Sequence, residues 1–160
     1  MRPTSGTSVG LGFILGGAFG WVGQWLLVAT GNPALVPPLT WGGALAALGA
    51  IAMALAWPIR KRVKKPALEP PIDPFYATRV VLLAKAGAIA GSALTGIALG
   101  FLVFVLSRPV MSSSALWPTI VALVGAVVLT VGALLAERWC AIPPDSPEHA
   151  LDEVPEGEIP

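Results

Sequence analysis

The chain has 160 residues, of which 55% are hydrophobic and 12% are charged. A soluble domain carries about 25% charged residues, so this composition excludes an ordinary soluble globular protein. The formal net charge of +1 gives no general attraction to nucleic acid. The apolar runs add up to four spans of the length that a bilayer requires, which predicts one all-α integral membrane unit, a bundle of four transmembrane helices.

Residue types that commonly build metal and catalytic sites are scarce. The chain contains one cysteine, Cys140, and one histidine, His149. A single cysteine excludes an intramolecular disulfide and a metal site made of cysteines alone. A single histidine disfavours histidine metal sites and a Ser-His-Asp triad within one chain. The sequence therefore predicts no catalytic residue, no cofactor and no metal site.

The first apolar run covers about residues 9–29 and follows a short polar lead. It exceeds the 7–15 apolar residues of a signal peptide, so we predict an uncleaved membrane anchor. Gly12, Gly16 and Gly20 recur every four residues and share one helix face. Small residues let two helices approach closely in lipid, which predicts a tight helix–helix seam. The general abundance of glycine in membrane helices is the alternative explanation.

A proline-rich loop at residues 30–40 leads to a second helix, predicted at about 41–58. Its end is expected at Pro58, because proline disfavours helix at the residue before it. Small residues again recur every four positions, at Gly42, Ala46, Ala50 and Ala54. The short loop favours antiparallel packing of this stripe against the first helix.

The only dense run of charge in the sequence follows the second helix. It contains Arg60, Lys61, Arg62, Lys64 and Lys65. Basic residues accumulate on the cytoplasmic side of short loops, so this run predicts a multi-pass protein with both termini in the cytoplasm. These five residues are also candidate contacts for anionic lipid headgroups, each contributing about 1 kcal/mol near the surface. The alternative is that these five residues only fix the topology and bind no particular lipid.

A third helix is predicted from Pro74 to about Leu106, with Asp73 as its N-cap. At ~50 Å it would be longer than the hydrocarbon core, so its first turns belong in the headgroup layer. Lys85 is a functional candidate because it is an ionisable residue in a membrane helix, and the predicted partner is Glu137 in an interfacial ion pair. Extension of the lysine to the headgroups is the alternative. Further close-packing glycines on this helix are Gly87, Gly91, Gly96 and Gly100.

The fourth helix is predicted at about residues 116–138, which completes a membrane domain over residues 1–142. Residues 143–160 are rich in proline and acidic residues and contain no lysine or arginine. A segment of this composition cannot bury a hydrophobic core, so we predict a disordered acidic cytoplasmic tail.

Several short strings together resemble a known family. They are Arg2-Pro3-Thr4, Pro37-Pro38, Trp57-Pro58 before the basic run, Asp73-Pro74, Arg79 with Leu83-Ala84-Lys85-Ala86, and Glu137-Arg138-Trp139-Cys140 with Pro143-Pro144. The chain resembles an actinobacterial family of small four-helix membrane proteins classed as a domain of unknown function, often encoded beside folate-biosynthesis enzymes. The resemblance covers nearly the whole chain and implies an actinobacterial plasma-membrane protein. It implies no activity, and none of these residues indicates folate chemistry.

The distribution of polar side chains argues against an enzyme, because no carboxylate lies within an apolar run and no acid, base and nucleophile are grouped. We expect a non-enzymatic accessory or scaffold protein that packs against other membrane components. The alternative is a small homo-oligomeric transporter or channel, although prolines occur only at the predicted helix ends and do not break a helix at mid-depth. The expected partners are the lipid bilayer, anionic lipids, and other membrane proteins or further copies of the chain; nucleic acid is not expected.

Overall fold

The computed structural model describes residues 4–64, 74–108 and 113–140, and these residues form four helices and no strand. The helices are α1 (Gly6–Ala29), α2 (Leu39–Lys64), α3 (Pro74–Leu106) and α4 (Ser113–Cys140). Each helix is long and apolar enough to cross a membrane. The predicted all-α architecture of four membrane helices is therefore confirmed over this part of the chain. The predicted N-cap Asp73 and the acidic tail at 143–160 lie outside the described residues.

Helices α1, α2 and α4 extend beyond their predicted limits, whereas α3 has the limits that were predicted. Ser5 caps α1, and its hydroxyl accepts a hydrogen bond from the Ser8 N–H at 3.3 Å. Helix α2 continues through Pro58 to Lys64, past its predicted end. A proline inside a helix removes its own N–H bond to the fourth residue back and its ring crowds that carbonyl, at a cost of about 3 kcal/mol. In the same turn, the Tyr76 hydroxyl of α3 donates to the carbonyl of Leu55 at 3.1 Å, which ties α2 to α3 near the proline.

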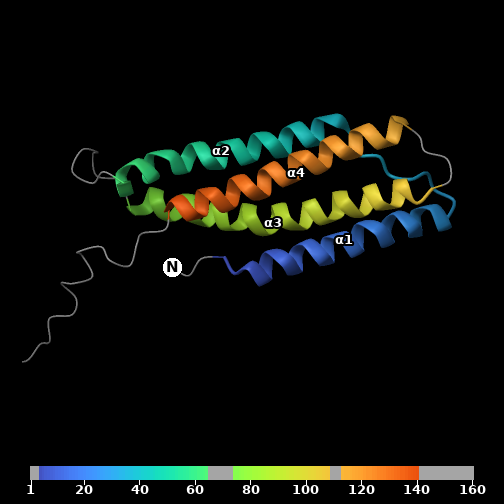
Figure 1. Cartoon of the computed structure of the whole chain (residues 1–160), viewed down its shortest axis with the longest axis horizontal. Coiled ribbons are helices and arrows are strands. Elements are labelled where there is room, and N and C mark those ends of the chain that lie inside the picture. The colour runs from blue at the N-terminus through green and yellow to red at the C-terminus, as the bar shows by residue number, and fades with distance from the viewer. Residues whose placement is uncertain (1–3, 65–73, 109–112, 141–160) are drawn as a thin grey trace, which may run out of the picture.

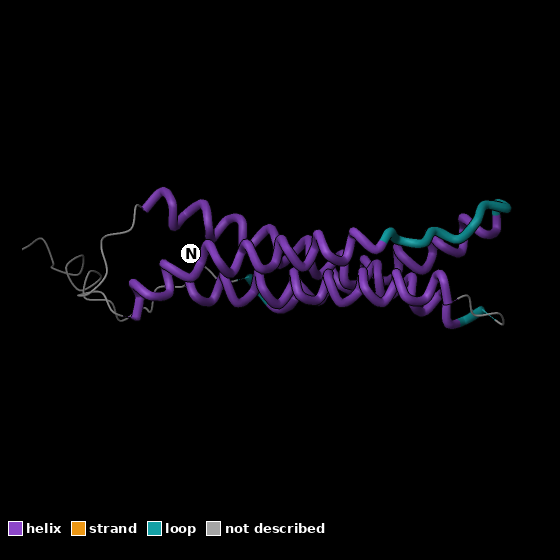
Figure 2. Tube along the Cα trace, turned by 90° about the horizontal axis from the view of Figure 1, so that it is seen from above, coloured by secondary structure: helices purple, strands orange, loops and turns teal. Residues whose placement is uncertain are grey.

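The helices lie side by side in the order α1, α3, α4, α2, with α1 and α2 at the two edges (Figure 1). Helices α1 and α3 run in one direction, and α2 and α4 run in the opposite direction. The described segments between helices, residues 30–38 and 107–108, lie at the end of the bundle opposite the start of α1 (Figure 2). We call the end that contains the start of α1 the basic end. The described basic side chains nearest this end are Arg60, Lys61, Arg79 and Arg138, with Lys85 further along α3, whereas Arg108 lies at the opposite end.

The expected packing of α2 against α1 is wrong, because α2 packs along α4 and has no contact with α1 in the described part of the chain. The buried residues of α2 follow steps of three, four and seven: Gly42, Gly49, Ala52, Ala56 and Ile59. Of the predicted stripe, Ala50 and Ala54 are exposed. A helix has 3.6 residues per turn, so a stripe with a constant step of four drifts around it and leaves the buried face.

Helices α1 and α3 pack with their backbones in contact along the glycines of both helices. The backbone of Gly16 lies directly against the carbonyl of Ala93, and a side-chain carbon placed on Gly20 would lie 2.9 Å from the Cα of Ile97. On the α3 side, a carbon placed on Gly100 would lie 2.8 Å from the N of Trp21. Real Cβ atoms do not approach backbone atoms this closely. Any residue larger than glycine at these positions therefore forces the two helices apart.

The α2–α4 pair repeats this geometry. Gly42 lies against Gly125, and a carbon on Gly132 would lie 2.8 Å from the carbonyl oxygen of Gly49. The α1–α3 pair contains a corresponding contact between Gly17 and Gly100. These three glycine pairs have the same separation along the chain, and each pair joins alternate helices, α1 to α3 or α2 to α4. The bundle therefore consists of two parallel helix pairs with similar seams.

The two pairs join where α3 meets α4. Gly87 lies beside Ala133, and a carbon on Gly91 would lie 3.1 Å from the Cα of Thr130. Nearer the basic end, mainly small side chains of three helices form a buried apolar cluster. This cluster contains Ala52, Ala56, Ile59, Val80, Ala84, Ala136 and Cys140. Small residues dominate both regions, so helices α2, α3 and α4 converge closely there.

The loop between α1 and α2 is attached to the bundle through Gln24, whose side chain is fully buried. The Nε2 of Gln24 donates to the carbonyl of Leu35 at 2.6 Å, and the N–H of Leu35 donates to Oε1 at 2.9 Å. A buried amide in an apolar region is costly unless both its donor and its acceptor are paired. These two bonds satisfy Gln24 and hold the loop against α1.

We predict that Gly16→Leu lowers the free energy of unfolding by about 3 kcal/mol, because the new side chain meets backbone atoms that cannot rotate away. Gly23→Leu is the matched control, since it lies on the same helix and has nothing within 4 Å of an added Cβ. The measurement is reversible unfolding in mixed micelles. Equal losses in the two variants would disprove the role assigned to the α1–α3 seam.

Candidate functional site

Arg60 is held at the basic end by two tryptophan rings. Its guanidinium carbon lies 5.7 Å from the ring centroid of Trp57 and 4.4 Å from that of Trp139. The two indoles meet edge to face, with centroids 6.0 Å apart at an angle of 74°. Cation–π contacts of this kind contribute about 0.5–1 kcal/mol at exposed sites. Arg60 therefore joins the end of α2 to the end of α4, in addition to its predicted role as a lipid contact.

The other candidate lipid contacts follow Arg60 in the chain, toward and beyond the end of α2. Lys61 is exposed in the last turns of α2. Arg62 and Lys64 belong to the same helix by their backbone. Lys65 lies outside the described residues. Binding of anionic headgroups by these side chains stays a prediction.

Glu137 is paired with the segment that precedes α1. It lies in the last turn of α4 and is 9% exposed. The N–H of Thr4 donates to Oε1 at 2.5 Å, and the Thr4 hydroxyl donates to Oε2 at 2.6 Å. A carboxylate that accepts from both an N–H and an O–H is strongly held at low exposure. The predicted Lys85–Glu137 ion pair stays a prediction, since the contacts that the structure gives to this carboxylate come from Thr4.

Lys85 lies on the same face of α3 as Ser92, because seven residues make almost two complete turns. It is half-buried. The neighbouring Ala84 packs in the same cluster as Ala136, so this level of α3 is also the level of Glu137 on α4. Lys85, Glu137 and Thr4 therefore lie at similar depth near the basic end.

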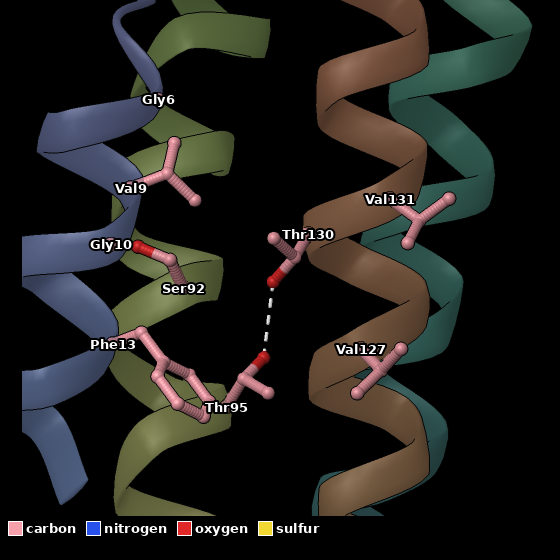
Figure 3. A pocket seen from close by; sticks show the side chains of 9 residues that line it. All are labelled: Gly6, Val9, Gly10, Phe13, Ser92, Thr95, Val127, Thr130 and Val131. Atoms are coloured by element: carbon pink, nitrogen blue, oxygen red, sulfur yellow. Dashed lines mark hydrogen bonds between the residues drawn. The ribbon is translucent and has the colours of Figure 1, made fainter.

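An open groove separates α1 from α4, with α3 as its floor (Figure 3). Its volume is about 370 Å³. The α1 wall is lined by Gly6, Val9, Gly10 and Phe13. The α4 wall is lined by Val127, Thr130 and Val131, and the floor is formed by Ser92 and Thr95 of α3. The groove exists because α1 and α4 each pack on α3 without touching one another as helices.

The hydroxyl groups of the floor form hydrogen bonds within the protein. Ser92 donates to the carbonyl of Ile89 at 2.8 Å. The hydroxyls of Thr95 and Thr130 lie 3.1 Å apart across the groove floor (Figure 3), and both also lie within 2.9 Å of carbonyls in their own helices. No buried side-chain nitrogen or oxygen among the described residues lacks a partner. The floor is thus polar in composition but needs no further ligand.

The Thr4–Glu137 pair spans the same two elements that form the groove walls. Thr4 precedes Gly6 on the α1 side, and Glu137 follows Val131 and Thr130 on α4. Seven residues separate Thr130 from Glu137, so both side chains lie on one face of α4. The pair therefore bridges the groove at the basic end and fixes the distance between its walls there.

The described residues contain no group of three or more His, Cys, Asp and Glu side chains that could hold a metal ion. Cys140 is a buried free thiol in the apolar cluster at the basic end.

Some of these features had a signal in the sequence. Trp57 and Arg60 are three residues apart, a spacing that brings side chains together on a helix. The contact of Arg60 with Trp139 depends on the pairing of α2 with α4, which the sequence pattern did not indicate. The groove and the Thr4–Glu137 pair likewise depend on the gap between α1 and α4.

A family model described as "Protein of unknown function (DUF3180)" matches residues 11–144. This match confirms the resemblance to a domain of unknown function. The comparisons with curated proteins and with solved structures gave no match.

We predict that Thr4→Val and Glu137→Gln are energetically coupled, with an interaction of about 1.5 kcal/mol, because the lost hydroxyl bond is made to a charged acceptor. The measurement is a double-mutant cycle of unfolding free energies in mixed micelles. A second cycle with Lys85→Gln and Glu137→Gln tests the predicted ion pair, and we expect a smaller coupling there. Additive effects of the Thr4 and Glu137 substitutions would rule out the bridge.

Proposed function

The chain belongs to the family described as "Protein of unknown function (DUF3180)", and we propose that it is a non-enzymatic accessory or scaffold protein that packs against other membrane components. The open row of helices is the observation that supports this proposal most. In a closed four-helix bundle each helix packs against two neighbours around a shared core. Here the edge helices α1 and α2 remain on opposite sides of the row.

The outer face of α2 supports close approach by another helix. Gly43, Ala47, Ala50 and Ala54 follow one another in steps of three and four, and all four are exposed. Nothing lies within 4 Å of the Cβ position of Gly43. Lipid gives helices no hydrophobic reason to associate, so small residues that allow backbone contact are the usual means by which a partner helix binds.

The outer face of α1 has a different character. Leu11, Ile14, Leu15, Phe19 and Val22 are exposed on it and are between 51% and 73% accessible. Side chains of this size suit acyl chains or a partner with matching gaps, but they prevent backbone-to-backbone approach. A partner helix would therefore pack more closely on the α2 edge than on the α1 edge.

The groove supports a second candidate function, a small homo-oligomeric transporter or channel. Ser92, Thr95 and Thr130 place hydroxyl groups deep between apolar walls. If a second copy covered the open side, these hydroxyls would line an enclosed path. The complete internal pairing of the described buried polar atoms favours the accessory role, because a transported polar solute would have to displace these bonds.

We also propose the finer assignment that the protein lies in an actinobacterial plasma membrane with both termini in the cytoplasm. The distribution of charge supports the orientation, since Arg60, Lys61, Arg79 and Arg138 share one end and Arg108 lies at the other. The family resemblance supports the source and the membrane. Proximity of the gene to folate-biosynthesis genes remains an expectation from that resemblance.

We predict that gentle extraction from the native membrane yields a heteromeric complex, whose intact mass exceeds that of one chain plus bound lipid. Native mass spectrometry with identification of the released subunits measures this. Ala50→Leu should release the partner, whereas Leu11→Ala on the opposite edge should retain it. A homo-oligomer would support the transporter alternative, and a monomer throughout would contradict both.

We predict that a thiol reagent confined to the cell exterior labels Asn32→Cys and does not label Lys61→Cys, both in a Cys140→Ser background. Asn32 lies in the exposed loop after α1, and Lys61 is exposed at the basic end. After permeabilisation, both positions should react. Exterior labelling of Lys61→Cys in intact cells would reverse the proposed orientation.

A further inference from the structure

We propose that the groove between α1 and α4 binds one acyl chain of an anionic phospholipid, with the phosphate of that lipid at Lys85. The lipid belongs to the leaflet at the basic end of the bundle. This site differs from the basic run at the end of α2, because it combines a chain-binding groove with Lys85 on the floor helix α3.

The shape of the groove favours a chain. Phe13, Val127 and Val131 along its edges are 37–49% exposed, so the groove is open to the surrounding membrane. The added Cβ positions of Gly6 and Gly10 have nothing within 4 Å, which leaves the α1 wall recessed. A volume of about 370 Å³ falls within the range of small-molecule sites. These features describe an elongated apolar recess along the bundle.

The chemistry of the floor favours an apolar occupant over a polar one. Ser92, Thr95 and Thr130 already form hydrogen bonds with their own helices and, for the two threonines, with one another. An acyl chain leaves these bonds intact. A polar solute would have to break them and would gain little in exchange.

The positive charge of Lys85, at the end of the groove nearest the basic end, favours a lipid with an anionic headgroup. Ser92 marks the floor, and Lys85 lies two turns closer to the basic end on the same face of α3. A lipid whose chain occupies the groove therefore has its phosphate near the ammonium of Lys85. Glu137 lies at the same level and keeps its negative charge, but two hydrogen bonds from Thr4 hold its carboxylate in the bridge between α1 and α4, so the phosphate approaches Lys85 from the membrane side of that bridge. Arg138 adds a second positive charge in the last turn of α4.

The test uses the full chain in nanodiscs made from equal amounts of phosphatidylglycerol and phosphatidylcholine. After transfer to a mild detergent, native mass spectrometry counts the lipids that remain bound. We expect one retained phosphatidylglycerol per chain. Gly10→Leu should abolish this retention by filling the groove, and Gly6→Leu provides a second groove-filling variant should the first fail to fold.

Matched controls separate this site from general lipid binding. Gly43→Leu adds the same side chain on the exposed face of α2 and should retain the lipid. Lys85→Gln should lower the preference for phosphatidylglycerol about fivefold, which corresponds to about 1 kcal/mol, whereas Arg108→Gln at the opposite end of the bundle should leave it unchanged.

Three outcomes would overturn the proposal. The first is unchanged retention in folded Gly10→Leu and Gly6→Leu. The second is equal retention of phosphatidylcholine and phosphatidylglycerol by the original chain. The third is a dimer or heteromer that dissociates in these two variants, because a protein would then occupy the groove.

Discussion

Direct contact between helix backbones is the interaction on which the rest of this structure depends. Helices in a bilayer gain no hydrophobic energy by associating, so they pair where their surfaces fit closely. Glycines provide that fit between α1 and α3, and again between α2 and α4. Because these seams join alternate helices, the chain forms a row with α1 and α2 at its edges. The groove and the exposed face of α2 both follow from this order.

Much of the fold followed from composition and length. The limits of α3 agree with the prediction from Pro74 to Leu106, since a proline favours the first helical position and the apolar run was long and uninterrupted. The glycines of α1 were identified because they share one face. The helix against which they pack was not predictable. A face of small residues allows another helix to approach closely, but it does not determine which helix that is.

The errors in the α2 prediction have two physical causes. Pro58 was expected to end the helix, yet α2 continues to Lys64, and the hydrogen bond from Tyr76 to the Leu55 carbonyl ties the same turn to α3. Ala50 and Ala54 were expected in the seam, yet the helical period places Ala52 and Ala56 there. At the candidate site, Lys85 and Glu137 were singled out because charge is rare in this chain, whereas the role of Thr4 had no signal, since a threonine in a polar lead is unremarkable in composition.

The basic end combines these long-range contacts in a small region. Arg60 joins α2 to α4 through Trp139, and Thr4 joins the start of α1 to the end of α4. Both contacts reach α4 near its last turn, so α4 is attached to both edge helices there. The Arg60–Trp139 contact and the Thr4–Glu137 contact therefore both involve the end of α4, on opposite sides of that helix.

The alternating order of helices has a consequence for how the protein is made. During synthesis α1 and α2 enter the bilayer before either of their partners exists, and they have no contact with one another in the finished bundle. The Gln24–Leu35 bonds can form at this stage, because both residues belong to the first half of the chain. The glycine faces of α1 and α2 lack their native partners until α3 and α4 emerge from the ribosome. Biogenesis therefore passes through a two-helix intermediate with unfilled seams, a state on which an insertase or a chaperone of membrane helices would act.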